Sequence, residues 1–206
     1  MAVNTIERYR MARYAAWQWR SELSLVQKLI LAFGMAALVG LAAQVRIPLP
    51  WTPVPITGQT TAALLAGVLL GRTWGGVSLG MYIGLGAAGL PWFAGWTAGA
   101  AVLAGATGGY LVGFILAAMF VGFVIDKYPQ MRTFNRMAGV MFLANFVLIF
   151  GPGLLQLNLW LSLVNGQSVG LYRLLVMGLF PFVAGEVIKT LAAAGAGWAL
   201  TPKQDR

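Results

Sequence analysis

A long interval without charge is the feature that most constrains how this chain can fold. From Thr73 to Ile125 the sequence contains no Asp, Glu, Lys or Arg. A helix needs roughly 20 apolar residues to cross about 30 Å of hydrocarbon, so the interval is long enough for two membrane spans. The proline and glycines of "GLPWFAGWTAG" interrupt helix formation in its middle, which predicts a turn between the two spans.

The composition of the whole chain supports a membrane protein. Of its 206 residues, 59% are hydrophobic and 9% are charged, and the mean hydropathy is +0.78. This leaves too little polar surface to cover a water-soluble globule. The sequence has neither His nor Cys, which removes the commonest general base, thiolate chemistry and soft-metal sites. We therefore expect no catalytic residue, no metal site and no cofactor, and a protein that is not an enzyme.

We place six spans along the chain, which predicts an all-α polytopic membrane protein built as a six-helix bundle. The spans lie near residues 25–45, 57–72, 74–90, 104–126, 136–157 and 180–200. Residues 1–24 precede them as an N-terminal segment, and residues 25–206 form a single transmembrane domain. We place Pro181 in the first turn of the last span, where its missing N–H costs nothing.

The basic residues predict the orientation of the bundle. With the N-terminus inside, the outer segments carry only Arg46 and Arg173. The cytoplasmic segments then carry Arg8, Arg10, Arg13, Arg20, Lys28, Arg72, Lys127, Arg132, Arg136, Lys203 and Arg206. By the positive-inside rule, both termini are expected in the cytoplasm of a bacterial cell, with the chain crossing its membrane several times. The net charge of +9 is then topological, and nucleic acid is not an expected partner.

Residues 1–24 lack the apolar core and cleavage site of a signal peptide. Four arginines alternate with aromatic residues, Tyr9, Tyr14, Trp17 and Trp19 among them. This pattern predicts a helix that lies on anionic membrane lipid at the cytoplasmic face. A partly disordered tail would also account for a segment of this kind.

The first outer segment, "VRIPLPWTPVPITGQTTAALLAG", holds an unusual pair of signals. Its four prolines, Pro48, Pro50, Pro53 and Pro55, forbid a helix and favour a stiff, extended chain. A polar cluster of Thr57, Gln59, Thr60 and Thr61 follows at the head of the second span. A helix cap explains one of these residues, and ligand contacts explain the others.

Four motifs in order resemble one family. They are "RIPLPWTPVPITGQTTAALLAGVLLG", "MYIGLGAAGLPWFAG", "GATGGYLVGFILAA" and "LFPFVAGEVIK", and they run from about Leu31 to about Leu200. The chain resembles the BioY family, the biotin-binding S component of energy-coupling-factor (ECF) vitamin transporters. The resemblance implies a six-helix subunit that captures biotin from outside, with a transmembrane (T) subunit and two cytoplasmic ABC-type ATPases as partners. Because the chain lacks a G-x-x-x-x-G-K-[ST] phosphate loop, any pumping must be powered by another protein.

Glu186 and Lys189 are two charges inside the apolar last span, three residues apart and therefore on one face. Each costs a few kcal/mol at membrane depth, so intramembrane charges are usually functional; a self-neutralising pair could instead fix helix packing. The resemblance implies biotin as the ligand, and Glu186 would then accept hydrogen bonds from its ureido N–H groups. Lys189 would either keep the Glu186 carboxylate ionised or meet the valerate carboxylate of biotin. The family motif usually has Asp where this chain has Glu186.

Further candidates follow from the resemblance and side-chain chemistry. Tyr82, Phe93, Gly108 and Tyr110 are expected at the substrate together with Thr57 and Gln59. Asn145 and Gln156 either bond across helices or line the pocket. The small residues Ala32, Ala36 and Gly40 form a stripe along the first span, which we expect to dock on the T subunit.

The function predicted from sequence is biotin capture and uptake. We expect the first outer loop and the turn around Trp92 to close over the ligand. An S component for riboflavin or thiamine would keep the same architecture with another ligand. A self-sufficient small-solute carrier would also fit an apolar bundle of this size, whereas an intramembrane enzyme fits poorly because the chain has neither His nor Cys.

Overall fold

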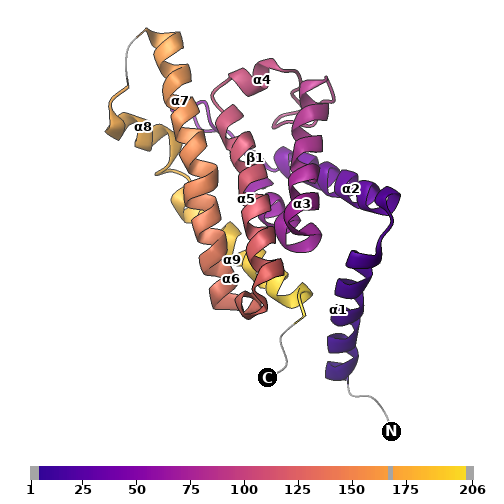
Figure 1. Ribbon diagram of the computed structural model, residues 1–206. Helices are drawn as coiled ribbons and strands as arrows, with labels where there is room; N and C mark the ends of the chain where they lie inside the picture. Colours follow the sequence, from indigo (N-terminus) through magenta and orange to yellow (C-terminus); the bar gives the residue numbers. More distant parts are fainter. Residues whose placement is uncertain (1–4, 167–168, 203–206) are drawn as a thin grey trace.

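The structure is a computed structural model that describes residues 5–166 and 169–202; Lys203 and Arg206, two of the predicted cytoplasmic charges, lie outside the described residues. Its elements follow one another as helices, with one small antiparallel pair of strands (Figure 1). In order they are α1 (Thr5–Glu22), α2 (Leu25–Gln44), β1 (Arg46–Ile47), β2 (Ile56–Thr57), α3 (Gln59–Ala87), α4 (Ala101–Ala104), α5 (Gly108–Lys127), the 3₁₀ turn η1 (Pro129–Arg132), α6 (Phe134–Leu143), the π-helical η2 (Ala144–Ile149), α7 (Phe150–Asn165), α8 (Leu171–Gly178) and α9 (Val183–Leu200).

Most of these helices are built to cross a membrane. Three helical segments are long and apolar enough by themselves, α2, α5 and the continuous run Phe134–Val164, and the 29-residue α3 is apolar along its length; their mean hydropathies lie between 1.4 and 2.2. The helices α8 and α9 make a further candidate, bent by 49°. Large apolar side chains stay exposed along the spans, for example Ile30, Leu41 and Leu155, as expected where lipid replaces water. The prediction of an all-α polytopic membrane protein is confirmed.

Helix α3 reverses direction at Gly71 and supplies two of the six spans. Gly71 has φ 79° and ψ −178°, a conformation that glycine tolerates and other residues avoid. In a straight helix Gln59 and Tyr82 would lie about 35 Å apart. Instead the Gln59 Nε2 donates to the Tyr82 hydroxyl over 2.8 Å. The halves 59–70 and 72–87 are therefore antiparallel, which agrees with the two spans predicted here.

The last two spans differ in detail from the sequence prediction. Pro181 lies in the bend between α8 and α9 and not in the first turn of the last helix, which begins at Val183. Glu186 is consequently in the first turn of α9, where the helix dipole favours a negative charge. The preceding span runs from α6 to α7 without a break, but η2 inserts a π-helical segment at its centre. Such insertions occur mostly at functional sites.

Helix α1 extends from the start of α2 at the lower right of Figure 1 and contacts α3, α5 and α9. The Arg13 guanidinium donates to the carbonyls of Ala199 and Thr201 at the end of α9, over 3.5 and 3.2 Å. Arg20 donates to the carbonyls of Val68 and Leu69, over 3.3 Å each. Both arginines supply partners to carbonyls near helix ends, where partners within the helix run out. Residues 5–22 thus form a helix docked on the bundle and not a free tail, and contact of this helix with lipid stays a prediction.

The small-residue stripe of α2 faces the interior of this chain. Ala32 and Ala36 have no exposed surface, and a Cβ added at Gly40 would lie 3.0 Å from the Trp92 Cβ. Within the chain the stripe therefore serves internal packing, and its docking on a T subunit stays a prediction. Its physical role is to let α2 approach α3 and the segment after α3 closely, because small side chains permit backbone contact within a membrane.

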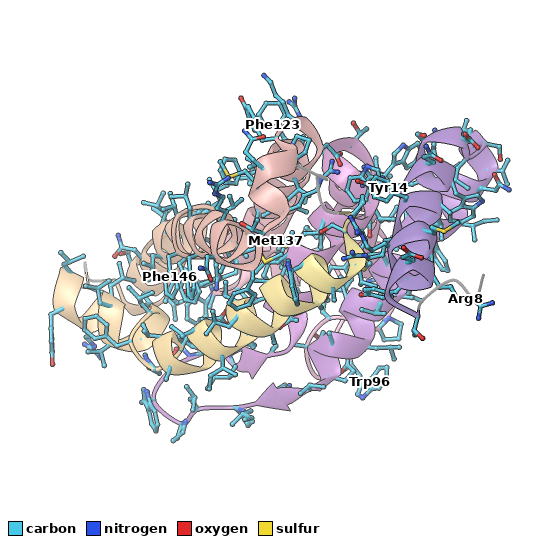
Figure 2. All side chains as sticks on the ribbon, turned by 90° about the horizontal axis from the view of Figure 1, so that it is seen from below. Arg8, Tyr14, Trp96, Phe123, Met137 and Phe146 are labelled. Carbon is cyan, nitrogen blue, oxygen red and sulfur yellow. The ribbon has the colours of Figure 1, made fainter. Side chains whose placement is uncertain are left out.

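We expect Arg13→Ala to destabilise the protein, because the substitution leaves carbonyls at the end of α9 without donors. Hydrogen bonds from a charged group contribute about 1.5–3 kcal/mol, so the thermal unfolding midpoint in detergent should fall by several degrees. Arg8→Ala is the matched control, since Arg8 is exposed and points away from the bundle (Figure 2). Equal midpoints for the two variants would contradict the capping role of Arg13.

Candidate functional site

A cavity of about 300 Å³ lies at the end of the bundle opposite α1. Its walls come from the proline-rich segment after β1, the turn after α3, and the helices α3, α5, α7 and α9. This volume is at the lower end of the range for small-molecule sites. Polar residues that line the cavity include Arg46, Thr52, Thr57, Gln59, Thr60, Thr97, Thr107 and Glu186. The cavity can enclose a small ligand that carries polar groups at separate points.

Two segments form the outer cover of this cavity. The strands β1 and β2 pair in antiparallel register, Arg46 with Thr57, so residues 48–55 form a hairpin loop over the cavity. Gln44 holds the second segment: its Nε2 donates to the carbonyls of Trp92 and Phe93 over 3.2 Å each, and its Oε1 accepts from the Trp96 N–H over 3.0 Å. Both predicted outer segments therefore lie against the cavity.

Glu186 forms the inner wall of the cavity. Its side chain is buried, and its Oε1 accepts hydrogen bonds from Lys189 and, over 3.3 Å, from the Thr60 hydroxyl. Its Oε2 accepts from the Asn145 Nδ2 over 2.9 Å. Lys189 also donates to the Thr57 carbonyl over 2.8 Å. The charge is thus neutralised inside the bundle, which a buried carboxylate requires.

The carboxylate keeps capacity for one more donor. An ionised carboxylate offers roughly four lone-pair positions, and three of those on Glu186 are used by Lys189, Thr60 and Asn145. Because Glu186 also lines the cavity, the remaining position is available to an N–H or O–H group of a ligand. The inner wall can therefore recognise a hydrogen-bond donor.

Aromatic rings make up much of the remaining wall. Tyr82 and Phe93 meet edge to face at 5.4 Å between centroids, and Tyr110 meets Phe150 in the same way at 5.5 Å. The Tyr110 hydroxyl donates to the Gly178 carbonyl over 2.8 Å. Since the hydroxyls of Tyr82 and Tyr110 are held by protein partners, both rings present fixed apolar faces to the cavity.

The structure brings together most of the residues that the sequence singled out. Those that line the cavity are Thr57, Gln59, Tyr82, Phe93, Tyr110 and Glu186. Lys189 is not among the lining residues and lies behind Glu186. Contact of each of these residues with a ligand stays a prediction.

Gly108 differs from the sequence expectation. It does not line the cavity. A Cβ there would lie 1.9 Å from the Leu103 carbonyl oxygen and 2.6 Å from the Gln156 Nε2. Gly108 therefore serves close packing between α4, α5 and α7. Gln156 bonds across helices to the carbonyls of Leu103 and Gly105, which decides between its two predicted roles.

Three further polar residues belong to the site, and of these only Arg46 is not named as a possible ligand or pocket residue from the sequence. Asn145 bonds across helices, to Glu186 and to the Thr190 hydroxyl, from the π-helical segment η2. Thr60 stands out in the sequence only as a member of a polar cluster. Arg46 stands out only through its charge, but its guanidinium lies against Gly95, where a Cβ would come within 1.8 Å of Nη1. A lone outer cation beside a proline-rich segment is the signal that could have identified Arg46.

The fold and the site define a polytopic membrane protein that encloses a small-molecule cavity between its helices. Three comparisons with known proteins agree on its family. The sequence model of the BioY family matches residues 11–205. The chain therefore belongs to the BioY family.

Named relatives cover most of the chain. It is 50% identical over 140 residues to the probable biotin transporter BioY of Methanothermobacter thermautotrophicus, across 68% of this chain and 89% of that protein. It is 35% identical over 169 residues to the biotin transporter BioY of Thermotoga maritima, across 82% and 92% respectively. A crystal structure of the S-component for biotin from an ECF-type ABC transporter matches with a TM-score of 0.74 and 26% identity, covering 85% of this chain and 90% of that chain.

We expect Asn145→Ala to destabilise the protein through the Glu186 network. The substitution removes a donor to the buried carboxylate, which should lower the thermal unfolding midpoint by about 5 °C, given about 1–3 kcal/mol for an unmet buried group. Asn158→Ala is the control from the same span, because the Asn158 side chain takes no part in the network. A midpoint of Asn145→Ala within about 1 °C of the control would show that the network does not depend on Asn145.

Proposed function

We propose that this chain binds biotin in the cavity and acts as the substrate-binding subunit of an ATP-driven ECF transporter. Its membership in the BioY family supports this proposal, as do the names of its relatives and the solved S-component for biotin. The role is one of binding and transport, without a chemical step on the ligand. Residues 25–206 are the substrate-binding unit, and α1 is an addition at its cytoplasmic end.

The observation that carries the proposal is the placement of opposite charges on one cavity. Glu186 lies on the inner wall with acceptor capacity to spare, and Arg46 lies on the outer cover. Biotin has a matching distribution: a ureido ring with two N–H donors, an apolar thioether body, and a valerate tail that ends in a carboxylate. The donors and the anion of biotin thus lie at opposite ends of an apolar body, as the acceptor and the cation do in the cavity.

This match assigns an orientation to biotin. The ureido N–H groups donate to Glu186, the bicyclic body lies among Tyr82, Phe93 and Tyr110, and the carboxylate reaches Arg46. Lys189 acts from behind, by keeping Glu186 ionised. In this arrangement Lys189 is a positioning residue and does not meet the valerate carboxylate.

The proposed topology places the cavity outside the cell. The end that carries α1 and the loops at Arg72 and Lys127 is rich in basic residues, which favours the cytoplasmic side and gives cytoplasmic termini. Inward release then depends on partners, since the chain has no phosphate loop for ATP. We infer a T subunit and two ABC-type ATPases in the cell membrane.

We expect Glu186→Gln to weaken biotin binding by roughly tenfold or more, because an amide is a poorer acceptor and leaves Lys189 without its counter-ion. Equilibrium binding to purified protein, with biotin, riboflavin and thiamine compared side by side, measures this effect. Glu22→Gln is the control, since Glu22 is exposed at the end of α1. Preference of the parent protein for a vitamin other than biotin would refute the proposed function.

Arg46→Gln tests the orientation of the ligand. It should weaken binding of biotin by about tenfold and leave binding of biotin methyl ester nearly unchanged, because the ester lacks the carboxylate that Arg46 would meet. Arg173→Gln is the matched control, an exposed arginine also assigned to the outer side. If biotin and its methyl ester lose affinity equally in Arg46→Gln, the carboxylate does not lie at Arg46.

A further inference from the structure

A second cavity, of about 310 Å³, lies at the other end of the molecule, between α1, α2 and the turn of α3. Three cations line it, Arg20, Lys28 and Arg72, together with one acid, Asp126. It shares no lining residue with the cavity near Glu186. Its chemistry is therefore independent of the proposed biotin site.

The charges of this second cavity are unbalanced. Asp126 is already paired with Arg20, at 2.5 Å between Oδ1 and Nη2. Within the described part of the chain, neither Lys28 nor Arg72 forms an ion pair, and Arg72 contacts only the ring face of Phe123 among charged and aromatic partners. Two cations therefore share one cavity without a counter-charge.

The backbone adds to this positive potential. Lys28 follows the first turn of α2, which contains no acidic residue, and Arg72 opens the second half of α3. The start of a helix carries partial positive charge, so a cation is unfavourable at Arg72, whereas Lys28 lies beyond the first turn of α2, where this effect has fallen off. With three cations and one acid on its walls, the cavity is chemically suited to an anion, which Lys28 and Arg72 can meet.

The other walls of the second cavity are apolar. Leu31 and Trp74 line it from α2 and α3. Along α2, the neighbouring Ile30 and Phe33 are 63% and 50% exposed and belong to a span of mean hydropathy 2.0. The cations therefore meet the hydrocarbon at the start of two membrane spans. A soluble anion needs no such apolar wall, whereas an anionic phospholipid presents a phosphate and acyl chains at this depth.

We propose that the cavity binds the phosphate group of an anionic phospholipid of the cytoplasmic leaflet. Lys28 and Arg72 hold the phosphate, and an acyl chain lies along Leu31 and Trp74. Arg20 forms part of the same cavity while it contacts α3 and α5. The lipid thus joins α1, α2 and α3 at one point.

The test uses the full chain and titrates palmitoyl-oleoyl phosphatidylglycerol or phosphatidylcholine into delipidated protein, with retained lipid counted by native mass spectrometry. The parent protein should retain one phosphatidylglycerol with an affinity at least about tenfold above that for phosphatidylcholine. The double variant Lys28→Gln/Arg72→Gln should lose about tenfold or more of the phosphatidylglycerol affinity, because each basic residue near a membrane surface raises the affinity for anionic lipid by about fivefold.

A matched control removes the same charge at the same face outside the cavity. Lys127→Gln/Arg136→Gln should retain phosphatidylglycerol like the parent, because neither residue lines the cavity. Circular dichroism and gel filtration establish that all variants are folded. Equal affinity of the parent for the two lipids, equal loss in both double variants, or displacement of phosphatidylglycerol by millimolar inorganic phosphate would each overturn the proposal.

Discussion

The ion pair between Glu186 and Lys189 is the constraint on which the rest of the bundle depends. A carboxylate at membrane depth is stable only with a counter-charge and a full set of donors. Lys189 supplies the charge from the same helix, Thr60 a donor from α3, and Asn145 a donor from η2. Since these partners come from three different spans, satisfying one charge fixes how three helices meet. The cavity is the space left beside that meeting point.

At both ends of the molecule, side chains donate hydrogen bonds to backbone carbonyls of neighbouring segments, but the donors differ between the two ends. At the cavity end, Gln44 and Tyr110 bond to carbonyls of neighbouring segments and hold the cover in place. At the other end, Arg13 and Arg20 reach from α1 to carbonyls of α9 and α3. The donors to these backbone carbonyls are therefore a neutral amide and a hydroxyl at the cavity end, and guanidinium groups at the end that we assign to the cytoplasm.

The membrane spans and the charged pair Glu186 and Lys189 can be predicted from the sequence, because both depend on strong local signals. An apolar run of fixed length predicts a helix, and two charges inside such a run are conspicuous. The internal packing of Ala32, Ala36 and Gly40 cannot be distinguished in the sequence from contact with a partner, because small residues serve internal and external contacts with the same spacing. For Asn145 the sequence leaves two roles open, a bond across helices or a place in the pocket wall, and only the structure shows that it bonds to Glu186 and Thr190 from a π-helical segment.

The reversal at Gly71 also affects how the chain can enter a bilayer. The halves of α3, residues 59–70 and 72–87, are roughly 18 and 24 Å long at 1.5 Å per residue, shorter than a hydrocarbon core of about 30 Å. Neither half satisfies the length requirement of an independent membrane anchor. The two halves must therefore be inserted together as one helical hairpin, already folded at a single glycine, with their polar cluster at Gln59 and Thr60 carried across by the pair.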